Sequence, residues 1–582
     1  MDTTKKIRLW KLITLLLSVS ICPLQIAAKK YTMEFKESDT LSARALDMTD
    51  HMISKQGIEW GELADFDVSK LKNADTLYLF LRNEHIELYA IFQSKDVNCS
   101  YTHYESFDKN AQAYVSILEN NVYADLSTSI GTYNLHSISD TKVIVVKYEA
   151  DIAEEPENSH FAKEEDMSEE EVHVIRDATP PVLRVLFLYT HAALNLVGSS
   201  NPNAQMRQVV YDYINKANES FVNSNINARI QLAYIGPTNY NEASQTWANA
   251  LKHFSNNNDG YMDEVHTLRN KYAADICVLF LDKDDYCGEA KTITANATTA
   301  FCIVHPTYGC NFKFTAVHEI GHLVGCRHNY SNDVNLVPYP YCHGYIHYVE
   351  NNPNNSWRTM MSYDNSCETG CKRIPYWSNP NVTYNSIPMG NTSLANNARV
   401  WNNRASTVAD FRTTHNQVVY TSANNNYSSI YENVEAETQI STGSGYEIQS
   451  GQIVDFLASS YIRLGPNTNI KRGAKFRAYI SDSAGTNNYP QFTNKRDENN
   501  VDISHNKSDI SIPISPNPAK DVLKIQYDGT LKDVFIYNAL GKVVYHGCET
   551  LIPVYSLPDG VYILCARTDD GDILQTKFLH QQ

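Results

Sequence analysis

The sequence predicts a multidomain protein in which one α/β (α+β) domain is flanked by β-rich modules. Its 582 residues exceed the roughly 250–300 residues over which a single hydrophobic core usually grows. Strand-like and helix-like segments alternate between residues 183 and 281, whereas short strand-like runs separated by Gly and Pro dominate the C-terminal flank. Hydrophobic residues make up 42% of the chain, which is enough apolar material for packed cores.

The charge balance restricts the class of partner. Lys and Arg total 49 against 66 Asp and Glu, so the formal net charge is −17, which argues against nucleic acid binding. Residues 151–171 contain ten carboxylates and one lysine, hence −9 of this total. Because like charges repel one another, we predict a solvated linker over residues 151–171.

The N-terminus predicts a secretory signal peptide over residues 1–28. Four basic residues precede the mostly apolar run Leu12–Leu24, and Ala27 and Ala28 supply small residues before Lys29. A membrane anchor is the alternative, but this run has 13 residues and a spanning helix needs roughly 18 or more. The mature protein is therefore expected to have no transmembrane helix.

Residues 29–176 form the first predicted folded unit, which is β-rich. Its strand-like runs are Thr76–Leu81, Ile86–Phe92 and Lys142–Tyr148. Arg176 follows the acidic linker and is a candidate site for proteolytic processing.

Residues 177–416 hold the predicted α/β domain. Alternation of strands with helices predicts a sheet on which the helices pack. The expected elements are the strand Leu183–Tyr189, the helix Ala204–Val222, the strand Arg229–Ile235, the helix Asp263–Tyr272, the strand Asp275–Leu281 and a last helix ending near Phe411.

A β-rich module is predicted over residues 417–483. This segment is rich in Asn, Ser, Gly and Tyr and contains short strand candidates such as Tyr461–Leu464. No long-period repeat is evident in it, and residues 484–510 are expected to be a polar linker.

Residues 511–582 predict a small β-sandwich of short alternating strands. The motifs Ser515–Pro518, Leu557–Tyr562 and Lys577–Phe578 resemble the C-terminal sorting domain of the type IX secretion system of certain Gram-negative bacteria. This resemblance implies that the chain uses the type IX machinery and is secreted or attached to the cell surface. A generic β-sandwich binding module is the alternative.

The strongest chemical signal is the segment His318–His328, which has the pattern H-E-x-x-H-x-x-G-x-x-H. On a helix, His318 and His322 lie four residues apart on one face, as a shared metal ion requires. Gly325 can end this helix with a positive φ and so allow His328 to reach the same ion. Three imidazoles predict a Zn²⁺ site with one open position.

Glu319 is predicted to be a general base rather than a metal ligand. An open zinc site lowers the pKa of bound water towards ~7, and an adjacent carboxylate can accept the proton of that water. The expected reaction is hydrolysis of a peptide bond. A structural zinc site or a chance match is the alternative, although structural sites normally fill the fourth position with protein.

The extended histidine motif resembles the metzincin clan of zinc endopeptidases, and Thr359–Tyr363 fits the Met-turn of that clan. The resemblance implies that a methionine forms an apolar floor beneath the metal. Met361 is favoured over Met360 because the Met-x-Tyr spacing runs from Met361 to Tyr363. Tyr363 is implied to donate a hydrogen bond to the tetrahedral oxyanion or to be an extra metal ligand. Ordinary core packing is the alternative for both side chains, since the chain has 38 tyrosines.

Further stretches resemble bacterial reprolysin-like enzymes related to peptidyl-Asp metalloendopeptidases, over residues 182–412. Asn329 departs from the pattern, because reprolysins usually have Asp after the third histidine. The stretches that carry the resemblance are Val185–Thr190, Asp259–Val265 and Arg373–Pro380.

Cleavage next to Asp is an implied substrate preference, and it would require a cation in the specificity pocket. Arg358 and Arg373 are candidates because they flank the Met-turn. Each has a surface or structural arginine as its alternative role. The scattered Asp and Asn residues do not define a calcium site.

The cysteines predict disulfides in an exported protein. Cys367 and Cys371 are close enough in sequence to form a bridge, and Cys548 with Cys565 is a second possibility. Cys326 lies inside the histidine motif and is expected to face away from the ion, as part of a bridge or as a buried thiol.

Cys99 is the only cysteine between the signal peptide and Arg176. A thiolate from this segment could ligate zinc and displace the catalytic water, which would keep the zymogen latent until cleavage. A buried or solvent thiol without such a role is the alternative. His305, His343 and His347 lack metal-ligand spacing and are expected to be structural.

The sequence as a whole predicts a secreted zinc-dependent endopeptidase, made as a zymogen, that acts on protein or peptide substrates. Residues 29–176 are then the pro-domain and residues 177–416 the catalytic domain. A surface-attached binding protein or adhesin with an incidental or inactive metalloprotease domain is the alternative. The complete set of zinc ligands, base and Met-turn argues against that alternative.

Overall fold

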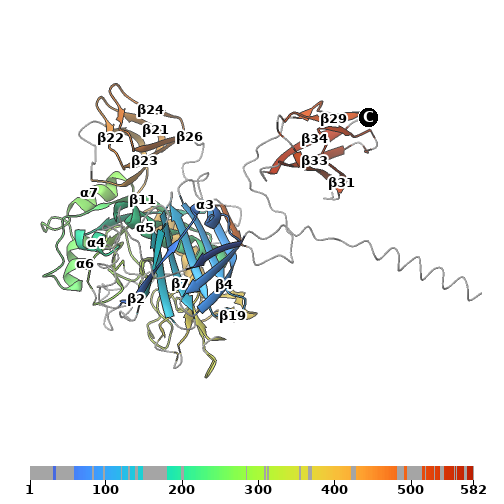
Figure 1. Ribbon diagram of the computed structural model, residues 1–582. Coiled ribbons are helices and arrows are strands. Elements are labelled where there is room, and N and C mark those ends of the chain that lie inside the picture. The colour runs from blue at the N-terminus through green and yellow to red at the C-terminus, as the bar shows by residue number, and fades with distance from the viewer. Residues whose placement is uncertain are drawn as a thin grey trace, which may run out of the picture. The chain divides into compact units, whose positions relative to one another are not determined.

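The computed structural model describes residues 30–34, 58–148, 180–480, 491–494 and 514–580, with short gaps inside these ranges. The chain divides into two compact units, residues 1–496 and residues 497–582 (Figure 1). The predicted signal peptide, the acidic linker and Arg176 lie outside the described residues. Within the described ranges, no helix combines the length and the apolar character needed to cross a bilayer.

A large, mostly antiparallel sheet, called the N-terminal sheet below, forms the first part of the larger unit, drawn in blue in Figure 1. Its strand order is β1-β3-β4-β5-β6-β7-β8-β9-β2, and β3 to β9 follow one another as antiparallel neighbours. The predicted strands Thr76–Leu81 and Lys142–Tyr148 are confirmed with the same bounds. The elements are β1 (Lys30–Glu34), β2 (Ile58–Asp65), α3 (Val68–Leu71), β3 (Thr76–Leu81), β4 (Glu84–Lys95), β5 (Cys99–Glu105), β6 (Gln112–Leu118), β7 (Asn121–Thr128), β8 (Gly131–Ser137) and β9 (Lys142–Tyr148), and β27 (Gln491–Asn494) pairs with β4.

A second sheet, in the order β13-β14-β12-β10-β11, lies at the centre of the predicted α/β domain. Strands β14, β12, β10 and β11 run parallel, and β13 pairs antiparallel with β14. Parallel neighbours need crossover connections, which the helices supply. The strands are β10 (Val182–Tyr189), β11 (Arg229–Pro237), β12 (Ile276–Phe280), β13 (Gly288–Ala290) and β14 (Phe301–Val304).

Helices cover both faces of this sheet, which explains why β10 is apolar almost throughout. Val185 and Phe187 pack in the core that contains α5, α9 and α10, whereas Leu186 and Leu188 pack in the core that contains α6 and α7. The predicted alternation is confirmed, although α6 was not expected from the sequence. The helices are α4 (His191–Leu196), α5 (Pro202–Asn223), α6 (Trp247–Ser255), α7 (Glu264–Lys271), α9 (Thr315–Val324) and α10 (Asn397–Ala409).

Residues 431–480 form a parallel coil with a 22-residue period. Tyr431 pairs with Ile453, and Ile453 pairs with Lys475, each 22 residues further along. Gly451 and Gly473 repeat at the same interval, both with positive φ. The expectation of no repeat is therefore wrong. The repeat is hard to see in the sequence because few side chains recur identically, and the 22-residue period is carried by buried apolar positions and by the glycines at the turns. The strands of the coil are β21 (Tyr431–Thr442), β22 (Glu447–Ile448), β23 (Ile453–Ala458), β24 (Tyr461–Arg463), β25 (Asn469–Ile470) and β26 (Lys475–Ile480), and the preceding strand β20 (His415–Tyr420) pairs parallel with β21.

This coil continues the central sheet, since β21 pairs antiparallel with β11. Between α9 and α10 the chain forms two small sheets around the Met-turn. Their strands are β15 (Ile346–His347), β16 (Trp357–Arg358), β17 (Lys372–Arg373), β18 (Asn379–Tyr384) and β19 (Ile387–Met389).

The second unit contains two antiparallel sheets around one apolar core. Cys548 is an exposed free thiol there, so the predicted bridge between Cys548 and Cys565 is wrong. The strands are β28 (Ile514–Ser515), β29 (Val522–Ile525), β30 (Leu531–Tyr537), β31 (Val543–Gly547), β32 (Leu551–Pro553), β33 (Gly560–Thr568) and β34 (Ile573–His580).

Candidate metal centre

Helix α9 carries the first two histidines of the motif, and its C-terminus redirects the chain. Gly325 has φ of 121°, as the sequence predicts, and its N–H donates to the carbonyl oxygens of Gly321 and His322. The Cys326 N–H donates to Gly321 O at 2.9 Å. These bonds satisfy the last carbonyls of the helix and turn the backbone towards His328.

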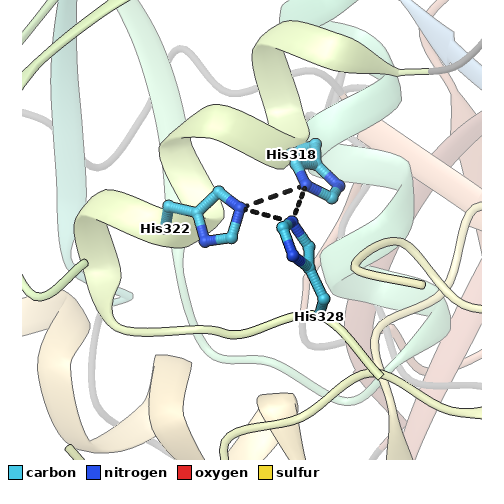
Figure 2. Close-up of side chains that lie close together, drawn as sticks. All are labelled: His318, His322 and His328. Atoms are coloured by element: carbon cyan, nitrogen blue, oxygen red, sulfur yellow. Dashed lines mark hydrogen bonds between the residues drawn. The ribbon is translucent and has the colours of Figure 1, made fainter. Parts of the chain in front are cut away.

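The three imidazoles converge on one point, as Figure 2 shows. The Nε2 atom of His318 lies 3.2 Å from that of His328 and 3.1 Å from that of His322, and the remaining pair is 3.0 Å apart. All three side chains are buried. This grouping of possible metal donors contains no other described His, Cys, Asp or Glu.

The donor set fits a zinc ion. His318 Nδ1 donates to Met360 O at 2.9 Å, and His322 Nδ1 donates to Cys326 O at 2.8 Å. Because a carbonyl oxygen only accepts, these bonds place the ring proton on Nδ1 and leave the Nε2 lone pairs pointing at one another. Nitrogens bound tetrahedrally at about 2.0–2.1 Å would lie roughly 3.3–3.4 Å apart, close to the observed spacing.

His343 holds the backbone of the third histidine, a contact that the sequence analysis missed. Its Nδ1 atom donates to His328 O at 2.9 Å, and the side chain is fully buried. Burial lowers the pKa of His343, so the ring is neutral near pH 7. His347 instead packs against Trp357, with ring centroids 5.2 Å apart, in line with a structural role.

Glu319 is fully buried on α9 beside the histidines. A Cβ atom on Gly288 would collide with Glu319 Oε1, so the bare backbone of β13 leaves room for this carboxylate. Gly288 was not recognised from the sequence, because its importance arises only when β13 is placed against α9.

The Met-turn lies under α9. A Cβ atom on Gly321 would lie 2.8 Å from Met361 Sδ and 2.8 Å from the Trp377 ring. Trp377 is itself fixed by a hydrogen bond from Nε1 to Ser220 Oγ at 2.8 Å. The glycine between the two α9 histidines is therefore required by close packing of the helix on Met361 and Trp377.

We expect Gly321→Ala to destabilise the protein. Alanine in place of glycine inside a helix normally stabilises by roughly 0.5–1 kcal/mol. Here the added methyl group overpacks a filled core, which costs about 1–3 kcal/mol. A lower melting temperature and a lower urea midpoint check this prediction, and a gain in stability would contradict it.

Tyr363 is joined to the third-histidine segment through Asn329. The Tyr363 N–H donates to Asn329 Oδ1 at 3.0 Å, while Asn329 Nδ2 donates to Ser331 Oγ and Asn332 Oδ1 at 2.6 and 2.7 Å. The Tyr363 ring centroid is 4.0 Å from that of His328. Asn329 both accepts and donates, which an ionised aspartate cannot do, and this accounts for the departure from Asp at this position.

Arg358 and Arg373 are buried at the base of the Met-turn. Their guanidinium groups donate to the same carbonyl, Ser362 O, at 2.5 and 2.9 Å, and Arg358 Nε also donates to Cys371 O. The two residues pair across β16 and β17. Both side chains thus brace the Met-turn backbone, and each is only 4% exposed.

Cys99 lies away from the three histidines. It is buried in β5 against α5, and its Sγ atom accepts from Asn215 Nδ2 at 3.7 Å. The described donors at the metal centre are His318, His322 and His328, without a thiolate. The expectation that Cys99 ligates zinc is therefore wrong. The strand that carries Cys99, β5, packs against α5, so the thiol faces that helix and not the three histidines.

The other described cysteines meet the expectation of disulfides only in part, because Cys277, Cys302 and Cys342 are buried free thiols. Cys326 is a buried thiol outside the ligand group, and burial raises its pKa well above the usual range. Cys367 and Cys371 form the predicted disulfide, and Cys287 pairs with Cys310.

Comparison with known proteins agrees with this geometry. Residues 179–386 match metallo-peptidase family M12, and residues 513–580 match the secretion system C-terminal sorting domain. A peptidyl-Asp metalloendopeptidase of Stenotrophomonas maltophilia (strain R551-3) is 42% identical over 234 residues, which cover 40% of this chain and 54% of that protein. A peptidyl-Asp metalloendopeptidase of Pseudomonas fragi is 32% identical over 197 residues, 34% of this chain and 100% of that protein.

The chain spans about half the length of the Stenotrophomonas relative. The family match over residues 179–386 includes the histidine motif and the Met-turn. The C-terminal match confirms the predicted sorting domain and marks the chain as secreted or attached to the cell surface. The Pseudomonas fragi relative is covered over its whole length. The chain therefore belongs to metallo-peptidase family M12.

Proposed function

We propose that this chain is a secreted zinc-dependent endopeptidase. The observation that carries this proposal is the convergence of the Nε2 atoms of His318, His322 and His328 beside the buried carboxylate of Glu319. Three neutral imidazoles leave one position open, as in catalytic rather than structural zinc sites. Membership of the M12 family supports the same conclusion.

Bound zinc supplies a Lewis acid that polarises a carbonyl and makes water a nucleophile near neutral pH. Glu319 then accepts the proton of the attacking water and later delivers it to the leaving amine. The carbonyls of Met360 and Cys326 keep the His318 and His322 rings in the tautomer that donates Nε2.

Met361 and Tyr363 have supporting roles in this proposal. Met361 forms the apolar floor on which α9 rests, since its sulfur packs against Gly321. The Tyr363 ring lies against His328, and we assign its phenol the role of hydrogen-bond donor to the oxyanion of the tetrahedral state. Asn329 holds the Tyr363 backbone in register with the third histidine.

Peptide bonds next to Asp are the proposed cleavage sites, because the named relatives are peptidyl-Asp metalloendopeptidases. Arg358 and Arg373 place two positive charges under the Met-turn, and Arg358 has Asp364 as a carboxylate partner at 3.8 Å. Buried as they are, these arginines would favour an anionic substrate side chain through their field rather than through direct contact.

The test of this function compares two peptides that differ only in Asp or Asn at one position. We expect the purified, processed enzyme to cleave the Asp peptide at least tenfold faster, to lose activity in a chelator and to regain it with added Zn²⁺. Equal cleavage of both peptides would contradict the proposed Asp preference but not the proposed endopeptidase activity. Activity that survives complete zinc removal would contradict the proposed mechanism.

The N-terminal sheet is the proposed pro-domain, and the sorting domain delivers the chain to the type IX machinery. The surface binding alternative predicts that loss of the metal leaves the biological activity unchanged. The chelator experiment above therefore separates the two functions.

A further inference from the structure

The parallel coil presents the same corner three times, just before the strands β21, β23 and β26 (Figure 1). Ser429, Gly451 and Gly473 occupy the equivalent position of each corner, 22 residues apart. The Gly451 N–H donates to Gly473 O at 3.0 Å, and a Cβ atom on Gly473 would lie 2.6 Å from Ser450 Oγ. The corners therefore stack directly on one another and form a continuous wall, at the spacing of neighbouring strands.

This wall borders a cavity of about 340 Å³ that lies between the coil and the start of α5. On the α5 side, the cavity is lined by Asn203, Ala204 and Arg207, and the rest of the lining comes from the corners of the coil. A Cβ atom on Gly451 would meet no atom within 4 Å, as expected for a residue that faces open space. A cavity of this size is in the range of small-molecule sites in proteins.

The charged side chains that line the cavity are both cationic. Arg207 comes from α5 and is 5% exposed, whereas Lys475 is the exposed first residue of β26. None of the described lining residues is Asp or Glu. With five N–H donors on the arginine and three on the lysine, both side chains can bind a ligand anion in addition to a protein partner. The cavity therefore favours a negatively charged group.

The polar groups of the coil wall hold one another in place. Gln452 Nε2 donates to Ser429 O at 3.1 Å and to Ser429 Oγ at 2.9 Å, while Gln452 Oε1 accepts from the Gln449 N–H at 2.7 Å. Ser429 Oγ donates to Glu432 Oε1 at 2.5 Å, so this buried carboxylate is bound by the wall itself. Because the wall is ordered before a ligand arrives, binding has a small entropic cost.

The size and the lining of the cavity limit the class of ligand. A phosphate or sulfate ion alone would fill only part of it, since one water molecule accounts for about 30 Å³ of liquid. No aromatic ring is among the described lining residues, which argues against a stacked nucleobase. Asn203, Gln449 and Ser428 carry groups that both donate and accept, as the hydroxyl groups of a sugar require.

We propose that the cavity between α5 and the coil binds an acidic saccharide unit, which is a sugar ring that carries a carboxylate or a phosphate group. Arg207 and Lys475 bind the anionic group from the two walls, and the amide and hydroxyl groups bind the ring. None of the three histidines of the metal centre lines this cavity. The coil thereby acts as a binding module for acidic glycans, and this role does not depend on peptide hydrolysis.

The experiment measures the binding of three probes to the full chain by isothermal titration calorimetry. The probes are glucuronate, glucose 6-phosphate and uncharged glucose, and the chain carries Glu319→Gln so that no peptide is cleaved during the titration. We expect at least one anionic probe to bind at one site per chain with Kd below about 1 mM, and glucose to bind at least tenfold more weakly. The more tightly bound anion distinguishes a carboxylate ligand from a phosphate ligand.

Arg207→Gln and Lys475→Gln each remove one positive charge from the cavity. We expect each variant to raise the Kd of the bound anion about tenfold or more. Arg463→Gln is the matched control, because Arg463 is exposed on β24 of the same coil and does not line the cavity. Its Kd should stay within twofold of that of the parent chain. An anion that binds at the metal centre instead would be insensitive to all three substitutions.

Three results would overturn the proposal: no binding of either anion at about 10 mM, equal binding of glucose and the anions, or an unchanged Kd in Lys475→Gln. If Arg207→Gln prevents folding, the exposed Lys475 position decides the test on its own. A short acetylated and amidated peptide that contains Asp serves as a fourth probe. Binding of this peptide without binding of either sugar anion would assign the cavity to acidic peptides and would contradict the saccharide ligand.

Discussion

Glu319→Gln is expected to lower kcat by roughly 10²- to 10⁴-fold, the range that general base catalysis usually contributes. The amide has almost the volume of the carboxyl group, so the space opposite Gly288 stays filled and the fold is retained. The three histidines are unchanged, and zinc should remain stoichiometric. Steady-state kinetics on the Asp peptide, with zinc measured by atomic absorption, checks the expected result.

Glu350→Gln is the matched control for this variant. It makes the same chemical change at an exposed glutamate of the same domain, and kcat should stay within twofold of the wild type. Full zinc-dependent activity in Glu319→Gln would contradict the role assigned to this carboxylate. Lost zinc in the same variant would show that Glu319 acts on the metal site rather than on the proton.

His328→Ala is expected to abolish stoichiometric zinc binding and, with it, activity. Removing one of three nitrogen donors leaves two ligands from α9, and structural or catalytic zinc sites in proteins use at least three protein ligands. His328 also comes from a different segment than the other two, so its loss frees the chain after Gly325 from the ion. Zinc content after dialysis and the shift of the melting temperature on zinc addition measure the effect.

His347→Ala provides the comparison, because His347 packs against Trp357 and makes no contact with the three Nε2 atoms. This variant should keep one zinc per chain. Stoichiometric zinc in His328→Ala would exclude the three-histidine site. A zinc-free but fully active His328→Ala enzyme would exclude the zinc mechanism altogether.

The predicted chemistry came from local spacing, which the chain displays without reference to its fold. The i, i+4 pair of His318 and His322 needs only a helix, and Gly325 needs only to tolerate positive φ. The strands Thr76–Leu81 and Lys142–Tyr148 were likewise predicted from their strand-like residue pattern. The 22-residue coil was not predicted, since the residues that pair in it are buried alike but are mostly of different types.

Contacts between distant segments required the tertiary structure. Gly288 leaves room for the Glu319 carboxylate because β13 lies beside it, and the His343 ring donates a hydrogen bond to His328 O. Neither residue lies in a sequence motif that would have indicated its role. The expected thiolate of Cys99 was wrong for the same reason, since its strand packs on α5.

The sequence by itself determined the spacing of the three histidines, the C-terminal sorting domain and the family. Only the tertiary structure decided what surrounds them. It placed buried charges of α5 under the N-terminal sheet, where Lys216 finds a carboxylate 91 residues away in sequence. The physical reason is that spacing along a helix fixes nearby side chains, whereas burial and charge pairing depend on which surfaces meet when the chain folds.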